Sequence, residues 1–149
     1  MMQRSLVGTW TLVSWEFRDA DGNVSYPFGR DATGYLTYAP DGYVWATTVS
    51  PNRVAFASPD LRKATTNEKV AAFDTYVSYC GTYELDGDTV IHHVRASLFP
   101  NWVGGDQKRI IEWVGDNLRL STPPIPIEGK AQTVHLLWRR LGASFPQNP

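Results

Sequence analysis

One stretch of the sequence gathers more chemically capable side chains than any other. Residues 86–105 carry two of the three histidines, His92 and His93, together with Arg95, and end in an aromatic loop around Trp102. An imidazole exchanges a proton near neutral pH and can serve as a general acid or base. The stretch therefore predicts a site at which a small molecule is bound or chemically rearranged.

The two adjacent histidines cannot share a role, because side chains of a strand alternate between its two faces. Along residues 89–98 one face carries Val90, His92, Val94, Ala96 and Leu98, and the other carries Thr89, Ile91, His93, Arg95 and Ser97. The first set has the character of a ligand cavity, with apolar walls and a single orienting polar group. We therefore predict that His92 and Val94 face the interior and that His93 lies outside.

The segments around this stretch have the alternation of β-strands separated by turns. Short antiparallel links between sequence neighbours, such as the Asp-Gly turn at 86–87, favour up-and-down connectivity. Eight strands without βαβ spacing predict an all-β fold, an eight-stranded antiparallel up-and-down β-barrel, because closure leaves no free edge. An open β-sandwich is the alternative. The expected strands are 6–17, 34–38, 43–49, 80–85, 89–98, 107–114, 118–122 and 132–141.

A single helix interrupts this pattern. Thr65 and Glu68 have the spacing of a capping box, and Val70, Phe73 and Val77 recur at helical spacing. We expect one short helix over about residues 66–79 that flanks or plugs the barrel.

Two proline-containing segments are expected to be loops. Residues 50–64 would form a long loop over one end of the barrel, and residues 123–126, with three prolines, would be unable to join a strand ladder. One domain is expected over residues 1–141, followed by a frayed tail at 142–149.

Several short motifs carry a family resemblance. Gly8-Thr9-Trp10 has the Gly-x-Trp signature of lipocalins and related calycins, at the start of the first expected strand. The others are Tyr26-Pro27-Phe28-Gly29, Tyr38-Ala39-Pro40-Asp41-Gly42, Gly81-Thr82-Tyr83, His92-His93-Val94, Pro100-Asn101-Trp102-Val103-Gly104 and Leu137-Trp138-Arg139-Arg140. Residues 6–140 thus resemble the lipocalin-like domain family of small intracellular β-barrels from bacteria and fungi. The resemblance implies a lipocalin-like barrel with the tryptophan closing one end. Some barrels of similar architecture act as isomerases or cyclases in natural-product pathways, although fold alone does not assign an activity.

A closed end at Trp10 would put Ser14 and Glu16 on the inner face of the first strand, progressively nearer the mouth. In an enzyme of this kind, His92 would be the general acid or base, and Glu16 would orient it or act as a second carboxyl catalyst. Ser14 would contact the ligand.

Four further residues are expected at the ligand. Tyr38 or Tyr83 would donate a hydrogen bond to an oxyanion, and Val94 would share the apolar wall with His92. Trp102 would either close the pocket as a lid or pack on its rim.

Other orientations stay open at this stage. The alternation around Arg109 and Glu112 does not decide which of them faces inward, and His135 tends outward because its alternate neighbours form the more apolar set. On the first strand, an outer face with Trp15 and Phe17 would need cover from the helix or from a second subunit, which predicts a homodimer.

Composition removes several classes of function. A net charge of −1 without a basic stripe argues against nucleic-acid binding. A single cysteine and unconverged histidines predict neither a disulfide framework nor a metal site. No apolar run is long enough for a membrane helix, and the N-terminal residues lack the apolar core of a signal peptide, so a cytoplasmic protein is expected.

We therefore expect a protein that binds one small apolar or aromatic molecule inside the barrel. The alternatives are a cofactor-independent isomerase or cyclase acting on a polyketide- or terpenoid-like molecule, and a structural or interaction protein with a filled barrel. No cofactor is expected, and haem on His92 is the nearest alternative because related barrels bind haem through one histidine. Convergence of His92 with Glu16 would favour the enzyme, and an apolar cavity would favour binding.

Overall fold

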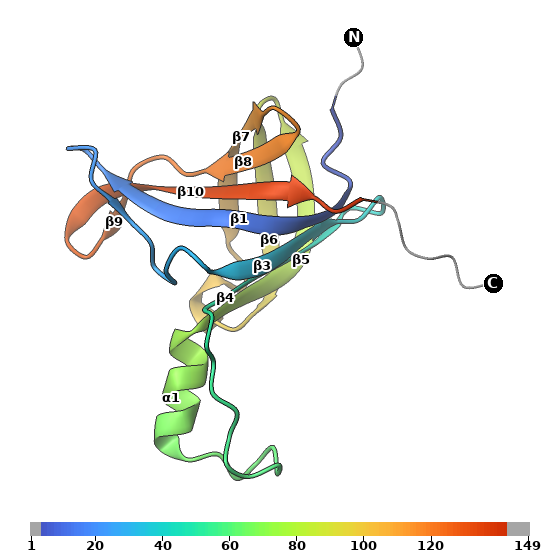
Figure 1. The fold of residues 1–149 in the computed structure, drawn as a ribbon. Helices are drawn as coiled ribbons and strands as arrows, with labels where there is room; N and C mark the ends of the chain where they lie inside the picture. The colour runs from blue at the N-terminus through green and yellow to red at the C-terminus, as the bar shows by residue number, and fades with distance from the viewer. Residues whose placement is uncertain (1–3, 143–149) are drawn as a thin grey trace.

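The computed structural model describes residues 4–142, most of which lie in strands (Figure 1). The alternating segments form the strands, and turns rich in Gly, Asp and Asn separate them. In chain order the elements are β1 (Gly8–Asp19), β2 (Val24–Ser25), β3 (Thr33–Tyr38), β4 (Tyr43–Val49), α1 (Thr66–Asp74), β5 (Tyr76–Asp86), β6 (Thr89–Ser97), the 3₁₀ turn η1 (Pro100–Trp102), β7 (Asp106–Val114), β8 (Asn117–Ser121), β9 (Ile125–Ile127) and β10 (Lys130–Arg140).

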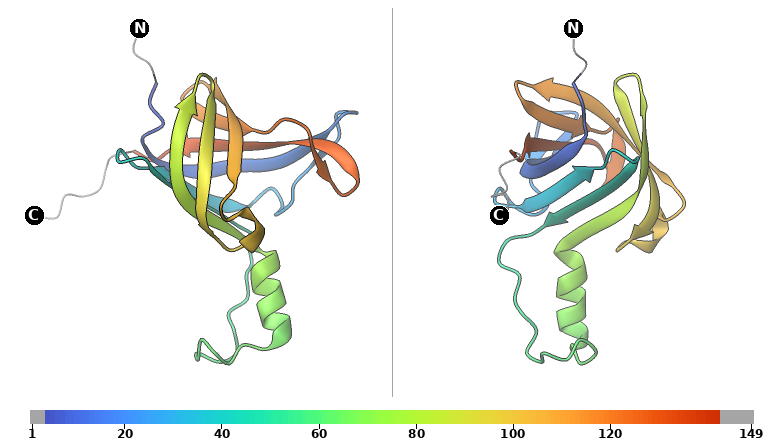
Figure 2. Two further views of the ribbon diagram at one scale, coloured as in Figure 1. Left: turned by 180° about the vertical axis from the view of Figure 1, so that it is seen from behind. Right: turned by 90° about the vertical axis from the view of Figure 1, so that its right-hand side faces the viewer.

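Eight of the strands described within residues 4–142 close into a barrel. They pair in the order β1-β3-β4-β5-β6-β7-β8-β10, and β10 returns to pair with β1. Every pairing is antiparallel, and apart from the two short strands and the closing pair of β1 with β10, each links neighbours in the chain. The predicted up-and-down barrel is therefore confirmed, and Figure 2 shows it from two further sides.

The pairing of β1 with β10 contains one extra residue, Val13. Leu12 lies opposite Trp138, and Ser14 already lies opposite Leu137. Val13 thus has no partner in β10, and its side chain is exposed. A one-residue bulge exchanges the two faces of a strand, so the residues of β1 that face the interior change parity at this point.

A second bulge, at Arg95, interrupts the pairing of β6 with β5. Gly81 lies opposite Val94, while Cys80 lies opposite Ala96. The backbones approach so closely here that a Cβ on Gly81 would lie 1.8 Å from the carbonyl oxygen of the residue preceding Val94. Only glycine fits this approach, and the faces of β6 also change parity beyond it.

Side chains fill the end of the barrel that lies near the start of β1. Trp10 is fully buried, donates from Nε1 to the Leu6 carbonyl oxygen over 2.9 Å, and has the Arg140 guanidinium 4.1 Å from its ring centroid. Arg140 also donates to the backbone oxygens of Val7 and Ser5, which ties the N-terminal segment to the end of β10. We call this region the closed end; its other buried members are Tyr38, Val44, Val90 and Leu118.

Helix α1 begins as predicted but ends earlier. Thr65 and Glu68 make both bonds of the capping box. The helix ends at Asp74, and Val77, which was expected on its apolar face, belongs to β5. Residues 76–79 pair with β4 instead. Their sequence fits the alternation of a strand as well as it fits the period of a helix.

The helix and the preceding loop project from the barrel (Figures 1 and 2). No residue of α1 is buried, and residues 50–65 run alongside it, with the amide of Ala57 donating to a Glu68 carboxylate oxygen over 2.9 Å. The expectation that this loop covers one end of the barrel is therefore wrong, since the loop extends away with the helix.

The proline segment is also partly a strand. Residues 125–127 pair with β10, with Pro126 opposite Ala131. This pairing is feasible because β9 is the last strand of the sheet, where a proline without an N–H breaks no ladder. Among residues 4–142 no helix has the length and apolarity that a membrane crossing requires. The tail predicted at 142–149 lies, apart from Gly142, outside the described residues.

Candidate ligand-binding site

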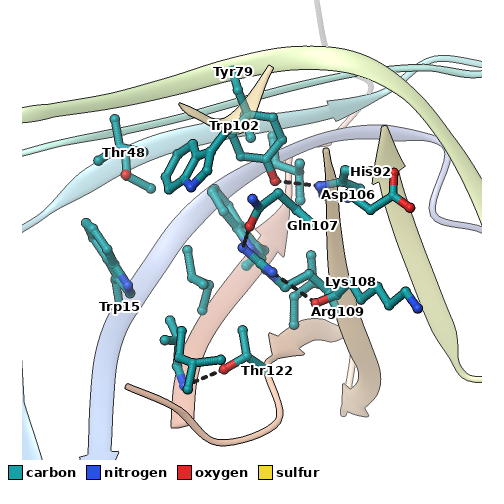
Figure 3. A pocket seen from close by; sticks show the side chains of 18 of the residues that line it. Trp15, Thr48, Tyr79, His92, Trp102, Asp106, Gln107, Lys108, Arg109 and Thr122 are labelled. Atoms are coloured by element: carbon teal, nitrogen blue, oxygen red, sulfur yellow. Dashed lines mark hydrogen bonds between the residues drawn. The ribbon is translucent and has the colours of Figure 1, made fainter. Parts of the chain in front are cut away.

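Beyond the closed end the barrel contains a cavity of about 510 Å³. This volume falls in the range of small-molecule sites, roughly 300–1,000 Å³. The apolar part of its wall comes from seven strands, and its members are Trp15 and Phe17 of β1, Leu36 of β3, Ala46 of β4, Val77 of β5, Leu120 of β8, Ile125 and Ile127 of β9, and Val134, Leu136 and Trp138 of β10. Figure 3 shows the polar side chains that enter between them. Such a cavity suits a small and largely apolar molecule.

A smaller cavity of about 290 Å³ adjoins the first. Trp15, Val77 and Trp102 line both cavities and therefore form the boundary between them. Trp102 packs edge-on against Tyr79, with ring centroids 5.8 Å apart. Two indole rings thus contribute aromatic surface to the cavity, against which another flat ring can pack.

Two tyrosines hold His92 at the inner end of the cavity. The Tyr38 hydroxyl lies 2.6 Å from Nε2 of His92, and the Tyr79 hydroxyl lies 2.5 Å from Nδ1. His92 is 2 % exposed and Tyr38 is fully buried. Both His92 and Tyr79 line the cavity, whereas Tyr38 lies behind them.

The direction of these two hydrogen bonds follows from the burial of Tyr38. A neutral imidazole donates from one nitrogen and accepts at the other. If His92 donated to Tyr38, the buried Tyr38 proton would have no acceptor among the described residues, which costs about 1–3 kcal/mol. Tyr38 therefore donates to Nε2, and Nδ1 of His92 donates to Tyr79. The remaining proton of Tyr79 is then free to be donated into the cavity.

His92 stays neutral in this arrangement. Burial, followed by the nearby positive charge of Arg109 and then by His93, lowers the pKa of His92 from 6.5 to about 3. Burial also raises the pKa of Tyr79, so the hydroxyl keeps its proton. Both ring nitrogens of His92 are occupied, and neither is left to bind a haem iron.

Arg109 brings a positive charge to the same cavity. Its guanidinium donates to Gln107 Oε1 over 3.1 Å and to the backbone oxygen of Lys108 over 2.9 Å. Both acceptors are neutral, and no carboxylate among residues 4–142 forms an ion pair with it. Figure 3 shows Arg109 and Gln107 extending toward the side of the cavity where Tyr79 lies. The polar groups of the cavity therefore favour a ligand oxygen that accepts hydrogen bonds.

The predicted register of β6 holds as far as its bulge. His92 and Val94 are buried and His93 lies on the outside, as expected. Ala96 and Leu98, which were expected to continue the inner face, are exposed, with Leu98 at 39 %. The parity change at the bulge is the reason for this difference.

The expected inner positions of Ser14 and Glu16 are wrong for the same reason. Beyond the bulge of β1, Trp15 and Phe17 line the cavity, and Ser14 and Glu16 occupy the opposite face. The Glu16 carboxylate forms an ion pair with Arg18 on that outer face. Glu16 therefore does not meet His92, and Ser14 does not reach the cavity.

The bulge also removes the reason for expecting a homodimer. That expectation rested on an apolar outer face containing Trp15 and Phe17, and both side chains contribute to the cavity wall instead. His135, opposite Glu16 on β10, lies on the outer face, where its sequence neighbours tended to place it. Glu112 is exposed, on the face of β7 opposite to Arg109.

The other predicted ligand contacts divide into two groups. Trp102 lines the cavity. Tyr38, Tyr83 and Val94 do not, and they support the site from behind. The Tyr83 ring packs edge-on against Tyr38 at 4.8 Å, and its hydroxyl donates to the Ala39 carbonyl oxygen over 3.0 Å.

Sequence reasoning missed Tyr79 and left Arg109 undecided. Tyr79 was counted at the end of the helix, although its alternation with Val77 is the signal of a strand that faces the cavity. Arg109 shares its face with Ile111 and Trp113, and this more apolar set identifies the inner side of β7.

The comparisons with known proteins agree with this geometry. The model of a family described as "Lipocalin-like domain" matches residues 7–141. A protein of Aspergillus oryzae named as a 4'-hydroxy-3'-methoxypropiophenone carrier protein is 32% identical over 105 residues, which cover 64% of this chain and 95% of that protein. No solved structure gives a significant match to this chain.

Proposed function

This chain belongs to the lipocalin-like domain family, and we propose that it is a carrier that binds one small aromatic ketone or phenol in the barrel cavity. The observation that supports this most strongly is the Tyr79 hydroxyl at a cavity of about 510 Å³ with mostly apolar walls; the hydrogen-bond directions derived above leave its proton free for a ligand. The ring of the ligand packs against Trp15 and Trp102, and one oxygen of the ligand accepts the hydrogen bond of Tyr79.

The name of the Aspergillus oryzae relative fits this chemistry. The ligand in that name is a methoxylated hydroxyphenyl ketone, a flat ring with oxygen acceptors. A cavity with aromatic walls and a hydroxyl donor recognises such a molecule through stacking and one directed hydrogen bond. We extend to this chain the class of ligand, a phenol that carries an acyl group, and not the individual compound.

In this proposal His92 is a positioning residue. A general acid or base needs a pKa near the working pH, whereas that of His92 is lowered to about 3 by burial, and both of its nitrogens are already bonded. The convergence of His92 with Glu16 that would have favoured an isomerase or cyclase is absent. The relay from Tyr38 through His92 fixes the Tyr79 hydroxyl and polarises it toward the ligand.

Titration calorimetry with para-hydroxyacetophenone and para-methoxyacetophenone tests the carrier function. We expect one molecule of either ligand per chain, recovered chemically unchanged. Tyr79→Phe removes one hydrogen bond of about 1 kcal/mol or more and is expected to lower both affinities at least about fivefold. Tyr35→Phe, at a tyrosine that is 58 % exposed, is the matched control and should bind as the parent chain does. Conversion of the ligand, or equal affinity of Tyr79→Phe and the parent chain, would contradict the proposal.

A further inference from the structure

The cavity contains a cation whose charge the described residues do not neutralise. Arg109 lines the cavity and is only partly exposed. Its two hydrogen bonds use two of the five guanidinium N–H donors, and both go to neutral oxygens. A partly desolvated cation without a counter-ion is costly, so an anion that enters the cavity is favoured.

The other charged groups at the cavity do not occupy the place of an anion beside Arg109. Asp106 lies at the rim of the cavity, with its carboxylate 2.7 Å from Nδ1 of His93 outside. Lys108, also at the rim, is exposed to solvent. His92 is neutral and Tyr79 protonated, so Arg109 supplies a positive charge to the cavity and Tyr79 supplies a hydroxyl donor.

We propose, resting on the carrier function above, that the cavity selects the phenolate form of an acylated phenol, with Arg109 as the counter-ion and the Tyr79 hydroxyl as the second donor. The phenol proton is released to water on binding. An acyl group para to the hydroxyl spreads the negative charge of the phenolate onto the carbonyl, so such a ligand ionises more readily than the tyrosines around it. Arg109 already stabilises negative charge at this position, since its charge opposes the rise in the pKa of Tyr38 and Tyr79 that burial causes.

The absorption spectrum of bound para-hydroxyacetophenone reports the protonation state directly, because phenolate absorbs at longer wavelength than phenol. At a neutral pH where the free compound is mostly phenol, we expect the bound compound to show the phenolate band. Arg109→Gln should abolish that band and weaken the affinity for this compound about 10- to 100-fold. Arg109→Lys should retain the band, because the charge is kept.

Two controls separate this inference from the carrier function. Para-methoxyacetophenone cannot ionise, so its affinity should change less than about threefold in Arg109→Gln, which also shows that the variant is folded. Arg95→Gln removes an exposed arginine of β6 that does not line the cavity, and it should leave the band intact. If both compounds bind the parent chain in neutral form, or if Arg109→Gln keeps the band, the role of Arg109 is overturned while the carrier function stands. If neither compound binds, both proposals fail.

Discussion

The closed end and the cavity are built by the same strands, yet one is packed and the other is hollow. At the closed end β1 points Trp10 inward, and the ring is covered by Leu6 and Arg140. Past the bulge, the same strand lines open space with Trp15 and Phe17. The fold therefore concentrates its packing at one end, which leaves the other end free to bind a ligand.

The bulge of β1 marks the boundary between the two regions, and a second bulge lies on β6. On β1 the change follows Val13, and on β6 it follows Arg95, just beyond the buried pair His92 and Val94. Bulges in barrels redirect side chains and increase local twist, and they are common next to binding sites. On β1 the bulge ends the packed alternation where the cavity lining begins, whereas on β6 the cavity-lining residue, His92, precedes the bulge.

The largest contrast is expected from truncating one tryptophan in each region. Trp10→Ala should lower the free energy of unfolding by about 3–5 kcal/mol, because the ring is fully buried and its indole N–H is bonded. Trp102→Ala should cost less than about 2 kcal/mol, since that ring already faces empty space, but it should weaken ligand binding. Urea unfolding of both variants measures the difference. Equal losses of stability would contradict the division into a packed and a hollow region.

A second contrast concerns how His92 and His93 change the stability of the fold as the pH falls. The unfolded chain protonates His92 below about pH 6.5, whereas the folded chain resists protonation to about pH 3, so stability should fall with decreasing pH in this window, by up to about 1.4 kcal/mol per unit. His93 has the opposite sign: Asp106 and then Glu84 raise its pKa, so its contribution is present at low pH and is lost as pH rises through the raised pKa.

Unfolding measured against pH distinguishes the two histidines. His92→Gln should flatten the decline on the acid side relative to the parent chain, and His93→Gln should leave that decline in place. A parent chain whose stability does not change between pH 6.5 and pH 4 would show that His92 is not held neutral in the folded state.

The third contrast fills the hollow region. Ala46→Phe places a ring in the cavity and should reduce the affinity for para-hydroxyacetophenone at least about 10-fold, since the ring competes with the ligand for the same space. Ala96→Phe makes the same enlargement at an exposed position of β6 beyond the bulge and should leave affinity within about twofold. Calorimetric titration measures the ligand affinity of both variants. Unchanged binding by Ala46→Phe would locate the ligand elsewhere.

The smallest effect is expected at Glu16. Because the bulge turns this residue outward to pair with Arg18, Glu16→Gln should change ligand affinity by less than about twofold and stability by less than about 1 kcal/mol. Phe17→Ala, one residue further along, should weaken binding because Phe17 lines the cavity. A large loss of binding in Glu16→Gln would contradict the outward orientation of Glu16 and show that it faces the cavity.

Alternation and turn chemistry were enough to predict the barrel, the position of the helix start at Thr65, and the burial of His92 and Val94. They fail at the bulges, because one unpaired residue reverses every later inward and outward assignment while leaving the local strand pattern unchanged. Val13 and Arg95 carry no turn signal in the sequence. For this reason Ser14 and Glu16 were expected in the cavity, and Trp15 and Phe17 were not.

The polar part of the site was harder to predict than its walls. His92 could be chosen by its apolar face, but its partners come from β3 and β5, far from it in the chain. The sequence does not encode the Tyr38 and Tyr79 contacts as a local pattern, since they depend on how the closed barrel brings the strands together. Arg109 did have a local signal, because it shares the inner face of β7 with Ile111 and Trp113, but the residues nearest to it, Ile110 to Glu112, left its side undecided.

A crystal structure of the complex with para-hydroxyacetophenone tests the central claim most directly. We predict that the ring lies against Trp15 and Trp102, with one ligand oxygen within hydrogen-bonding distance of the Tyr79 hydroxyl. A ligand bound outside the barrel, or one in the cavity whose oxygens all lie away from Tyr79 and Arg109, would contradict it.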